Sequence, residues 1–247
     1  MPEINPIRPT TPEAIQLAQT LLRSSRYGAL AVLDAKSGRP LASRVAVATD
    51  VDGTPVILVS GLAAHTPGLL AHSSCSLLLG EVGKGDPLAH ARVTLHCQAE
   101  KVDRTSPEYP QIRHRYLNHN PKGALYVDLG DFVFFRLRIE TASLNGGFGR
   151  AFNLSHEDLI SDPLASATIG SQEQQALDAL NQQYVSEIKA YIADIKGSLA
   201  NWKIIGLDPA GFDLGNGDHI VRMHFSSSCD SIEMCSEALA NRLKDRS

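Results

Sequence analysis

The chain has 247 residues, a length that suits one large domain or two small ones. Hydrophobic residues make up 43% and charged residues 20%, so there are enough apolar side chains for a packed core, and extensive disorder is excluded. The net charge of −4 excludes broad, sequence-independent nucleic-acid binding, which needs an excess of Lys and Arg, but it leaves room for a local anion site.

The first part of the chain predicts a helix followed by many strands. Thr11 can cap a helix that starts at Pro12, and apolar residues then recur at helical spacing. Beyond it, apolar and polar residues alternate with a period of two, and Asp52-Gly53 marks a hairpin turn. The close turn spacing is typical of an antiparallel barrel or sandwich. We expect strands at 28–34, 41–49, 55–60, 76–80, 92–102 and 132–143, and helices at 66–72 and 107–118.

The composition changes near residue 155, where the chain becomes polar, with Pro163 and Gly170 as breakers. This change predicts a linker at 156–170 between a first domain at 1–155 and a small α+β domain at 171–247. The small domain is expected to begin with a long helix at about 171–196, capped by Ser171. Short strands at 202–207, 212–214 and 219–225 and a closing helix at 230–244 complete the expected order.

The cysteine content and the N-terminus bear on the compartment. The chain is not disulfide-dense, which favours a reducing environment. Residues 1–11 are polar and Pro-rich, unlike a signal peptide, and no apolar run approaches the ~20 residues that span a bilayer. We therefore expect a cytoplasmic protein without membrane attachment. The four cysteines are Cys75, Cys97, Cys229 and Cys235. All except Cys229 lie in apolar or helical stretches, where buried thiols are usual.

One stretch of the sequence can bind an anion. Arg44 interrupts the apolar alternation of an expected strand, and Ser60, His65 and Thr66 lie where an expected short helix begins. A guanidinium, hydroxyl groups and the amides of a helix N-terminus together suit a phosphate. In the alternative interpretation, Arg44 pairs with a carboxylate while Ser60 and Thr66 only cap the helix, since caps are commoner than cofactor sites.

The order of several motifs resembles the pyridoxamine 5′-phosphate oxidase-like superfamily, and most closely its haem-utilisation branch. The similarity covers about residues 11–246, because the second half resembles a small α+β domain often appended to that branch. The motifs are Ser43-Arg44-Val45, Ser60-x-Leu62-x-x-His65-Thr66, Ser76-Leu77-Leu78-Leu79, Ala91-Arg92-Val93-Thr94-Leu95 and the Gly-rich stretch 145–151.

The resemblance implies an α+β fold with a six-stranded antiparallel split β-barrel, flanking helices and a small C-terminal α+β domain. It also implies a homodimer with cofactor sites at the subunit interface. The implied cofactor is flavin mononucleotide (FMN), with haem as the alternative. The residues that match the family's cofactor-binding positions are Arg44, Ser60, His65 and Thr66 for the phosphate, Val45, Ala46 and Val47 beside the ring system, and Leu62 and Arg92 nearby.

Three functions remain open at this point. The first is an FMN-dependent oxidoreductase acting on an unidentified small molecule, the second is a haem-binding or haem-degrading protein, and the third is a non-catalytic dimeric regulatory module. No general base stands out, so no catalytic residue is assigned. The C-terminal segment 240–244 lacks the Arg-containing motif of true pyridoxamine 5′-phosphate oxidases, which argues against that activity.

Two further groups of residues have competing interpretations. Histidines and cysteines lack a second well-spaced ligand pair, so no metal site is expected. Arg113, His114, Arg115 and His119 lie on an expected helix, where they either form a solvated face or attract haem propionates.

Overall fold

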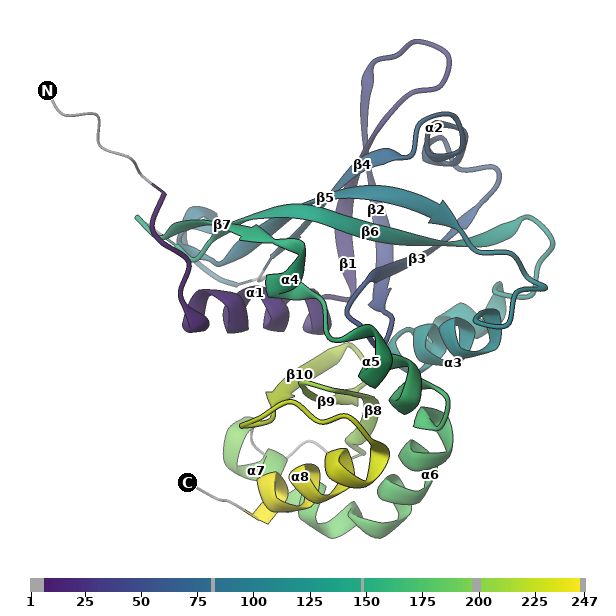
Figure 1. Ribbon diagram of the computed structural model, residues 1–247. Helices are drawn as coiled ribbons and strands as arrows, with labels where there is room; N and C mark the ends of the chain where they lie inside the picture. The colour runs from purple at the N-terminus through teal and green to yellow at the C-terminus, as the bar shows by residue number, and fades with distance from the viewer. Residues whose placement is uncertain (1–6, 81–82, 148, 197–200, 245–247) are drawn as a thin grey trace, which may run out of the picture.

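The computed structural model describes residues 7–80, 83–147, 149–196 and 201–244. Two antiparallel sheets dominate it, one of seven strands and one of three (Figure 1). The strands are β1 (Tyr27–Leu33), β2 (Pro40–Thr49), β3 (Pro55–Ser60), β4 (Ser74–Gly80), β5 (Arg92–Lys101), β6 (Phe132–Asn145), β7 (Ala151–Ser155), β8 (Lys203–Asp208), β9 (Gly211–Asn216) and β10 (His219–His224). The helices are α1 (Pro12–Ser24), α2 (His65–Ala71), α3 (Tyr109–His119), α4 (His156–Leu159), α5 (Pro163–Gly170), α6 (Glu173–Gln183), α7 (Val185–Lys196) and α8 (Ile232–Lys244). The expected α+β class is confirmed.

Strands β1 to β6 close into a barrel. Their order is β3-β2-β1-β4-β5-β6, and β3 also pairs with β6, which joins the two edges. β6 is long enough to pair with β5 along most of its length, with β3 at its start and with the extra strand β7 at its end. The strands alternate as their sequence predicts, since β1 buries Gly28, Leu30 and Val32 and exposes the residues between them. The predicted six-stranded antiparallel split barrel is confirmed.

The split lies between β2 and β3. These two strands pair only where Val47–Thr49 faces Pro55–Ile57, around the predicted turn at Asp52-Gly53. Beyond that point β3 follows β6 instead, and the 40–46 part of β2 is paired with β1. The barrel wall is therefore open along this half of β2.

Helix α1 covers one end of the barrel core, as the sequence predicts. The Thr11 hydroxyl accepts a hydrogen bond from the Ala14 amide, 3.3 Å away, and thereby caps the helix. Its apolar face is buried in the same cluster as side chains of β1, β4 and β5. The helix also faces β10, so it lies between the barrel and the second sheet (Figure 1).

The segment expected to be a linker, 156–170, instead contains α4 and α5. The polar residues and the proline of this segment start helices. Ser155 and Asp158 form a capping box at the start of α4. Asp162 caps α5, whose first residue is Pro163, by accepting a hydrogen bond from the Ala165 amide. The expected long helix at 171–196 is two helices, α6 and α7, which are separated at Tyr184. Gln172, not Ser171, occupies the N-cap position of α6.

Helices α5 to α8 surround the three-stranded sheet and form the C-terminal unit (Figure 1). Its apolar core also receives Val51 from the β2–β3 turn of the barrel. No helix in the described ranges is both long and apolar enough to cross a membrane. All four cysteines are buried free thiols, and burial raises the pKa of Cys75 to about 12, which makes it chemically inert at neutral pH.

A buried ionic network joins the barrel to the C-terminal unit. Arg222 of β10 donates to both carboxylate oxygens of Asp208, at 2.5 and 2.8 Å, and Arg23 of α1 lies 3.1 Å from the same carboxylate. Arg115 of α3 donates to Glu173 of α6. Burial alone would raise the pKa of Asp208, but the neighbouring Arg222 and Arg23 outweigh it and hold that pKa below its usual range.

His224 forms a second contact between the two parts of the chain. Its Nε2 lies 2.8 Å from the Thr20 hydroxyl of α1, and that hydroxyl already donates to the Gln16 carbonyl. The His224 ring must therefore be the donor in this pair. Burial, reinforced by Arg222, lowers the pKa of His224 to about 4, so the ring is neutral in the folded protein at neutral pH.

We expect this neutral histidine to make stability pH-dependent. An unfolded histidine has a pKa of about 6.5, so between pH ~6.5 and ~4 the unfolded state binds a proton that folded His224 does not. The free energy of unfolding should fall as pH drops through this window. His224→Gln should flatten the fall in urea titrations at pH 7, 6 and 5. Burial also lowers the pKa values of His65 and His119, so part of the slope will remain; an unchanged slope would contradict the assignment.

Candidate functional site

A groove of about 450 Å³ lies on the outer face of the barrel sheet. Its floor is made mainly of small side chains from β1, β2 and β4, and one wall is the segment that leads into β5. Its volume falls within the ~300–1,000 Å³ typical of small-molecule sites. The lining residues are Tyr27, Gly28, Ala29, Ala42, Ser43, Arg44, Leu78, Leu79, Gly80, Pro87, His90, Ala91 and Arg92.

Arg44 projects from β2 into this groove. It is exposed, and its guanidinium carbon lies 5.2 Å from the centre of the Tyr27 ring, which is a cation–π contact. No ion pair of Arg44 is found within the described part of the chain, so the predicted alternative in which a carboxylate neutralises it is not observed. The guanidinium remains available to an anionic ligand.

Arg92 enters the groove from the opposite wall. One of its terminal nitrogens donates to the carbonyls of Leu88 and His90, at 3.2 and 3.3 Å, and so holds this wall against the sheet. The His90 Nε2 lies 3.0 Å from the Lys84 carbonyl. Among the described residues that line the groove there is no Asp or Glu, so two guanidiniums dominate its electrostatics.

The open edge of β2 adds backbone groups. The Val47 amide donates to the Arg26 carbonyl, which fixes the phase of the β1–β2 ladder. Because alternate residues of a strand direct their backbone groups to opposite sides, Val45 also faces β1, whereas Arg44 and Ala46 face the opening. The side chains of Val45 and Val47 are buried in the barrel core. Of the three residues expected beside a ring system, Ala46 alone can direct its backbone groups into the opening.

The Ser60–Thr66 residues lie in a separate corner, at the β3–α2 junction. The Ser60 hydroxyl donates to Asp131 at 2.6 Å, and the Thr66 hydroxyl donates to the Ser60 carbonyl at 2.7 Å. The N-cap position of α2 is Ala64, without a side-chain cap, so the capping alternative does not describe this corner either. Leu62 is 90% exposed. His65 is buried, and its Nε2 has no hydrogen-bond partner among the described residues.

The structure therefore brings Arg44 and Arg92 into one groove and places Ser60 and Thr66 outside its lining. The sequence did not point to Tyr27 as a site residue. A signal for it existed, because in the hairpin register Tyr27 faces Ala46 and Ala29 faces Arg44, which makes Tyr27 and Arg44 diagonal neighbours on one face.

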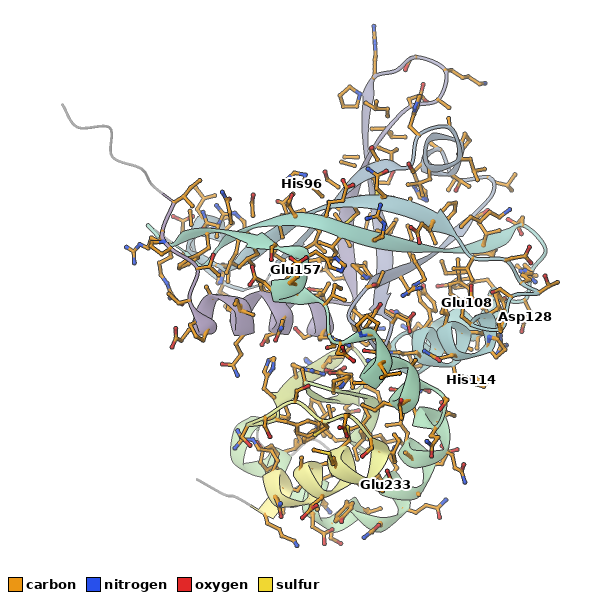
Figure 2. The ribbon with its side chains drawn as sticks, viewed as in Figure 1. His96, Glu108, His114, Asp128, Glu157 and Glu233 are labelled. Atoms are coloured by element: carbon orange, nitrogen blue, oxygen red, sulfur yellow. The ribbon has the colours of Figure 1, made fainter. Side chains whose placement is uncertain are left out.

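The basic cluster on α3 is not a single solvated face, because two of its four side chains are buried. His114 is exposed at the edge of the molecule, near Asp128, which pairs with Arg113 (Figure 2). Arg115 and His119 are buried, the first in the ionic network and the second 2.9 Å from the Arg23 carbonyl. Arg115 thereby joins α3 to the C-terminal unit, and His119 joins α3 to α1.

Comparison with known proteins identifies the family to which this barrel belongs. The sequence pattern of the family described as "CREG, beta-barrel" matches residues 9–161, which is more than half of the chain. The chain belongs to the CREG β-barrel family. This confirms the expected relationship to the split-barrel superfamily of pyridoxamine 5′-phosphate oxidase-like proteins. The similarity to a haem-binding protein is consistent with the haem-utilisation branch of that superfamily.

Individual relatives extend the similarity beyond the barrel. A chloroplastic haem oxygenase, HOZ, from Arabidopsis thaliana is 31% identical over 207 residues, a match that covers 81% of this chain and 62% of that protein. A solved protein of unknown function from Agrobacterium tumefaciens is 29% identical, with a TM-score of 0.80 over 98% of this chain and 100% of the other. A haem-binding protein from Mycobacterium smegmatis is 27% identical, with a TM-score of 0.56 over 96% and 99% of the two chains.

Proposed function

We propose that this protein binds haem in the groove between Arg44 and Arg92 and acts in the use of haem iron. The observation that carries the proposal is the pair of guanidiniums in one groove without a lining carboxylate. Haem carries two carboxylates on a flat apolar ring. Arginine pairs with carboxylates through parallel hydrogen bonds, so Arg44 and Arg92 suit the two propionates.

The floor of the groove suits the rest of such a ligand. Between Tyr27 and Arg44, the exposed β1 and β2 side chains that line the groove are the small Ala29 and Ala42, which leave the sheet surface low enough for a planar ring to approach. Gly80 ends β4 on the same floor, and a Cβ there would lie 3.1 Å from the Cβ of Arg92. Bound haem would supply the iron and its oxygen chemistry, while the protein would bind and orient it. The relatives named as haem oxygenase and haem-binding protein support this choice.

The test is a titration of the purified chain with haemin, followed by absorbance. A saturable Soret band at micromolar protein supports the proposal, and its absence would refute haem binding. Adding a reductant in air then separates an enzyme from a carrier, because an oxygenase converts haem to a biliverdin-type product and a carrier leaves it intact.

FMN is the second candidate for the same groove. Arg44 and the backbone groups at the open β2 edge can bind a phosphate-bearing flavin. The hydroxyls of Ser60 and Thr66, however, donate within their own corner, so they do not add to Arg44 as the sequence led us to expect. A parallel titration with FMN decides this candidate: a stoichiometric complex with FMN but not with haemin would favour an oxidoreductase.

We also propose that the protein is a homodimer in which the second copy covers this face. Small and apolar side chains form its centre, and Tyr27, Leu33 and Leu78 are 47%, 43% and 42% exposed. Towards β5 the face becomes polar, with His96 on the outer side of the sheet (Figure 2). Contiguous exposed apolar surface of this kind marks association sites.

Replacing Ala31 at the centre of this face by arginine tests the dimer. Ala31 lies opposite Ala42 on one side and Ser76 on the other, so a buried charge there would oppose association. We expect wild-type chain to sediment as a dimer and Ala31→Arg as a monomer. The matched control is Ala167→Arg on the exposed side of α5, which should remain dimeric. A wild-type monomer at tens of micromolar would contradict the proposal.

A further inference from the structure

The groove does not end at the barrel. A second cavity, of about 570 Å³, lies beside it and shares the lining residues Tyr27 and Gly80. Tyr27 begins β1 and Gly80 ends β4, so the two cavities meet at one end of the barrel sheet. The remaining walls are the end of α1 and, from the C-terminal unit, the start of β10. The lining residues are Leu21, Ser24, Ser25, Arg26, Tyr27, Gly80, Asp218, His219 and Ile220.

The β9–β10 turn is held against this cavity by a specific contact. Arg26, which directly precedes β1, forms an ion pair with Asp218 of the turn. The Nε of Arg26 is buried and has no hydrogen-bond partner within the described part of the chain. Contacts of α1 with β10 continue the attachment. The C-terminal unit is therefore anchored at the place where the groove continues.

His219 is the residue of this turn that can act on a ligand. It is exposed, it lines the cavity, and no hydrogen bond of its ring is found among the described residues. By contrast, the His90 Nε2 is engaged by the Lys84 carbonyl and the His224 Nε2 by Thr20. A free imidazole nitrogen is a good ligand for haem iron.

We propose that the C-terminal unit completes the haem groove and that His219 coordinates the iron of haem whose propionates are bound by Arg44 and Arg92. This inference rests on the proposed haem binding. It gives the C-terminal unit a direct part in the site, with the Arg26–Asp218 ion pair holding the β9–β10 turn in place. Tyr27, in contact with both cavities, would then lie beside the ring.

The test compares the ferric haem complexes of wild-type chain, His219→Ala and the control His72→Ala. His72 is an exposed histidine at the end of α2, outside both cavities. We expect wild type and His72→Ala to share an imidazole-ligated Soret and electron paramagnetic resonance spectrum. His219→Ala should lose that signature while still taking up haem, and added free imidazole should restore it.

The outcomes separate this inference from the function on which it rests. A His219→Ala complex with the wild-type spectrum would overturn the inference and leave haem binding intact. Absence of any haem complex in wild type would overturn both. Because the side chain is exposed, the thermal midpoint of apo His219→Ala should match wild type, which excludes misfolding as the cause of a lost signature.

Discussion

The double variant Arg44→Ala/Arg92→Ala is expected to lose most haem affinity. A hydrogen bond to a charged group contributes about 1.5–3 kcal/mol, which corresponds to roughly 10- to 100-fold in the dissociation constant for each residue. Both guanidiniums line the one groove, so the two losses should combine. The measurement is haemin titration followed by absorbance, with competition by apomyoglobin for tight complexes.

Two further variants make this result specific. Arg39→Ala removes the same charge from the exposed β1–β2 turn and should bind like wild type. Arg44→Lys keeps the charge but loses the planar, two-pronged donor, so its affinity should lie between wild type and Arg44→Ala. If the double variant binds haem within about threefold of Arg39→Ala, a difference below ~1 kcal/mol, the groove is not the haem site.

The second large effect is on stability. Arg222→Met should lower the free energy of unfolding by about 3–5 kcal/mol, because it removes the arginine that contacts two buried carboxylates; Asp208 keeps Arg23 nearby, but Asp213 loses its ion pair. Asp208 is fully buried, and Arg222 supplies two of its hydrogen bonds and a further contact, at 3.3 Å, to Asp213. Methionine fills a similar volume without restoring the charge.

An exposed ion pair provides the control for this experiment. Arg138 and Glu100 are about half exposed, and such pairs contribute at most about 1 kcal/mol. Urea unfolding at pH 7 should therefore separate Arg222→Met from Arg138→Met by several kcal/mol of unfolding free energy. An equal loss of unfolding free energy in the two variants would show that the network does not stabilise the folded chain.

The sequence predicted the barrel well because its strands are half-buried. In β1, β4 and β5 every second side chain enters one core, and this two-residue period is readable without any knowledge of partners. The strand β7 was missed, because it is five residues long and forms only by pairing with the end of β6. Residues 156–170 were misinterpreted, because Asp162-Pro163 can equally start a helix or break one.

The candidate site was only partly predictable. Arg44 and Arg92 were both named, and the strand order β2-β1-β4-β5 brings them to one groove. The predicted convergence of Arg44 with Ser60 and Thr66 assumed that β2 and β3 stay together, but β3 leaves β2 after Ile57 and follows β6. The contacts of Arg23 with Asp208 and of Arg115 with Glu173 could not be foreseen, because these partners come from elements far apart in the chain.

That network limits how freely the two parts of this protein can be recombined. Arg23 and Arg115 belong to the barrel side, yet their carboxylate partners Asp208 and Glu173 come from the C-terminal unit. A barrel cut away after residue 170 would retain both guanidiniums without those partners, and Val51 would lose its apolar cover. Exchange of C-terminal units between relatives would succeed only where the incoming unit carries both acidic residues and the receiving barrel carries both arginines.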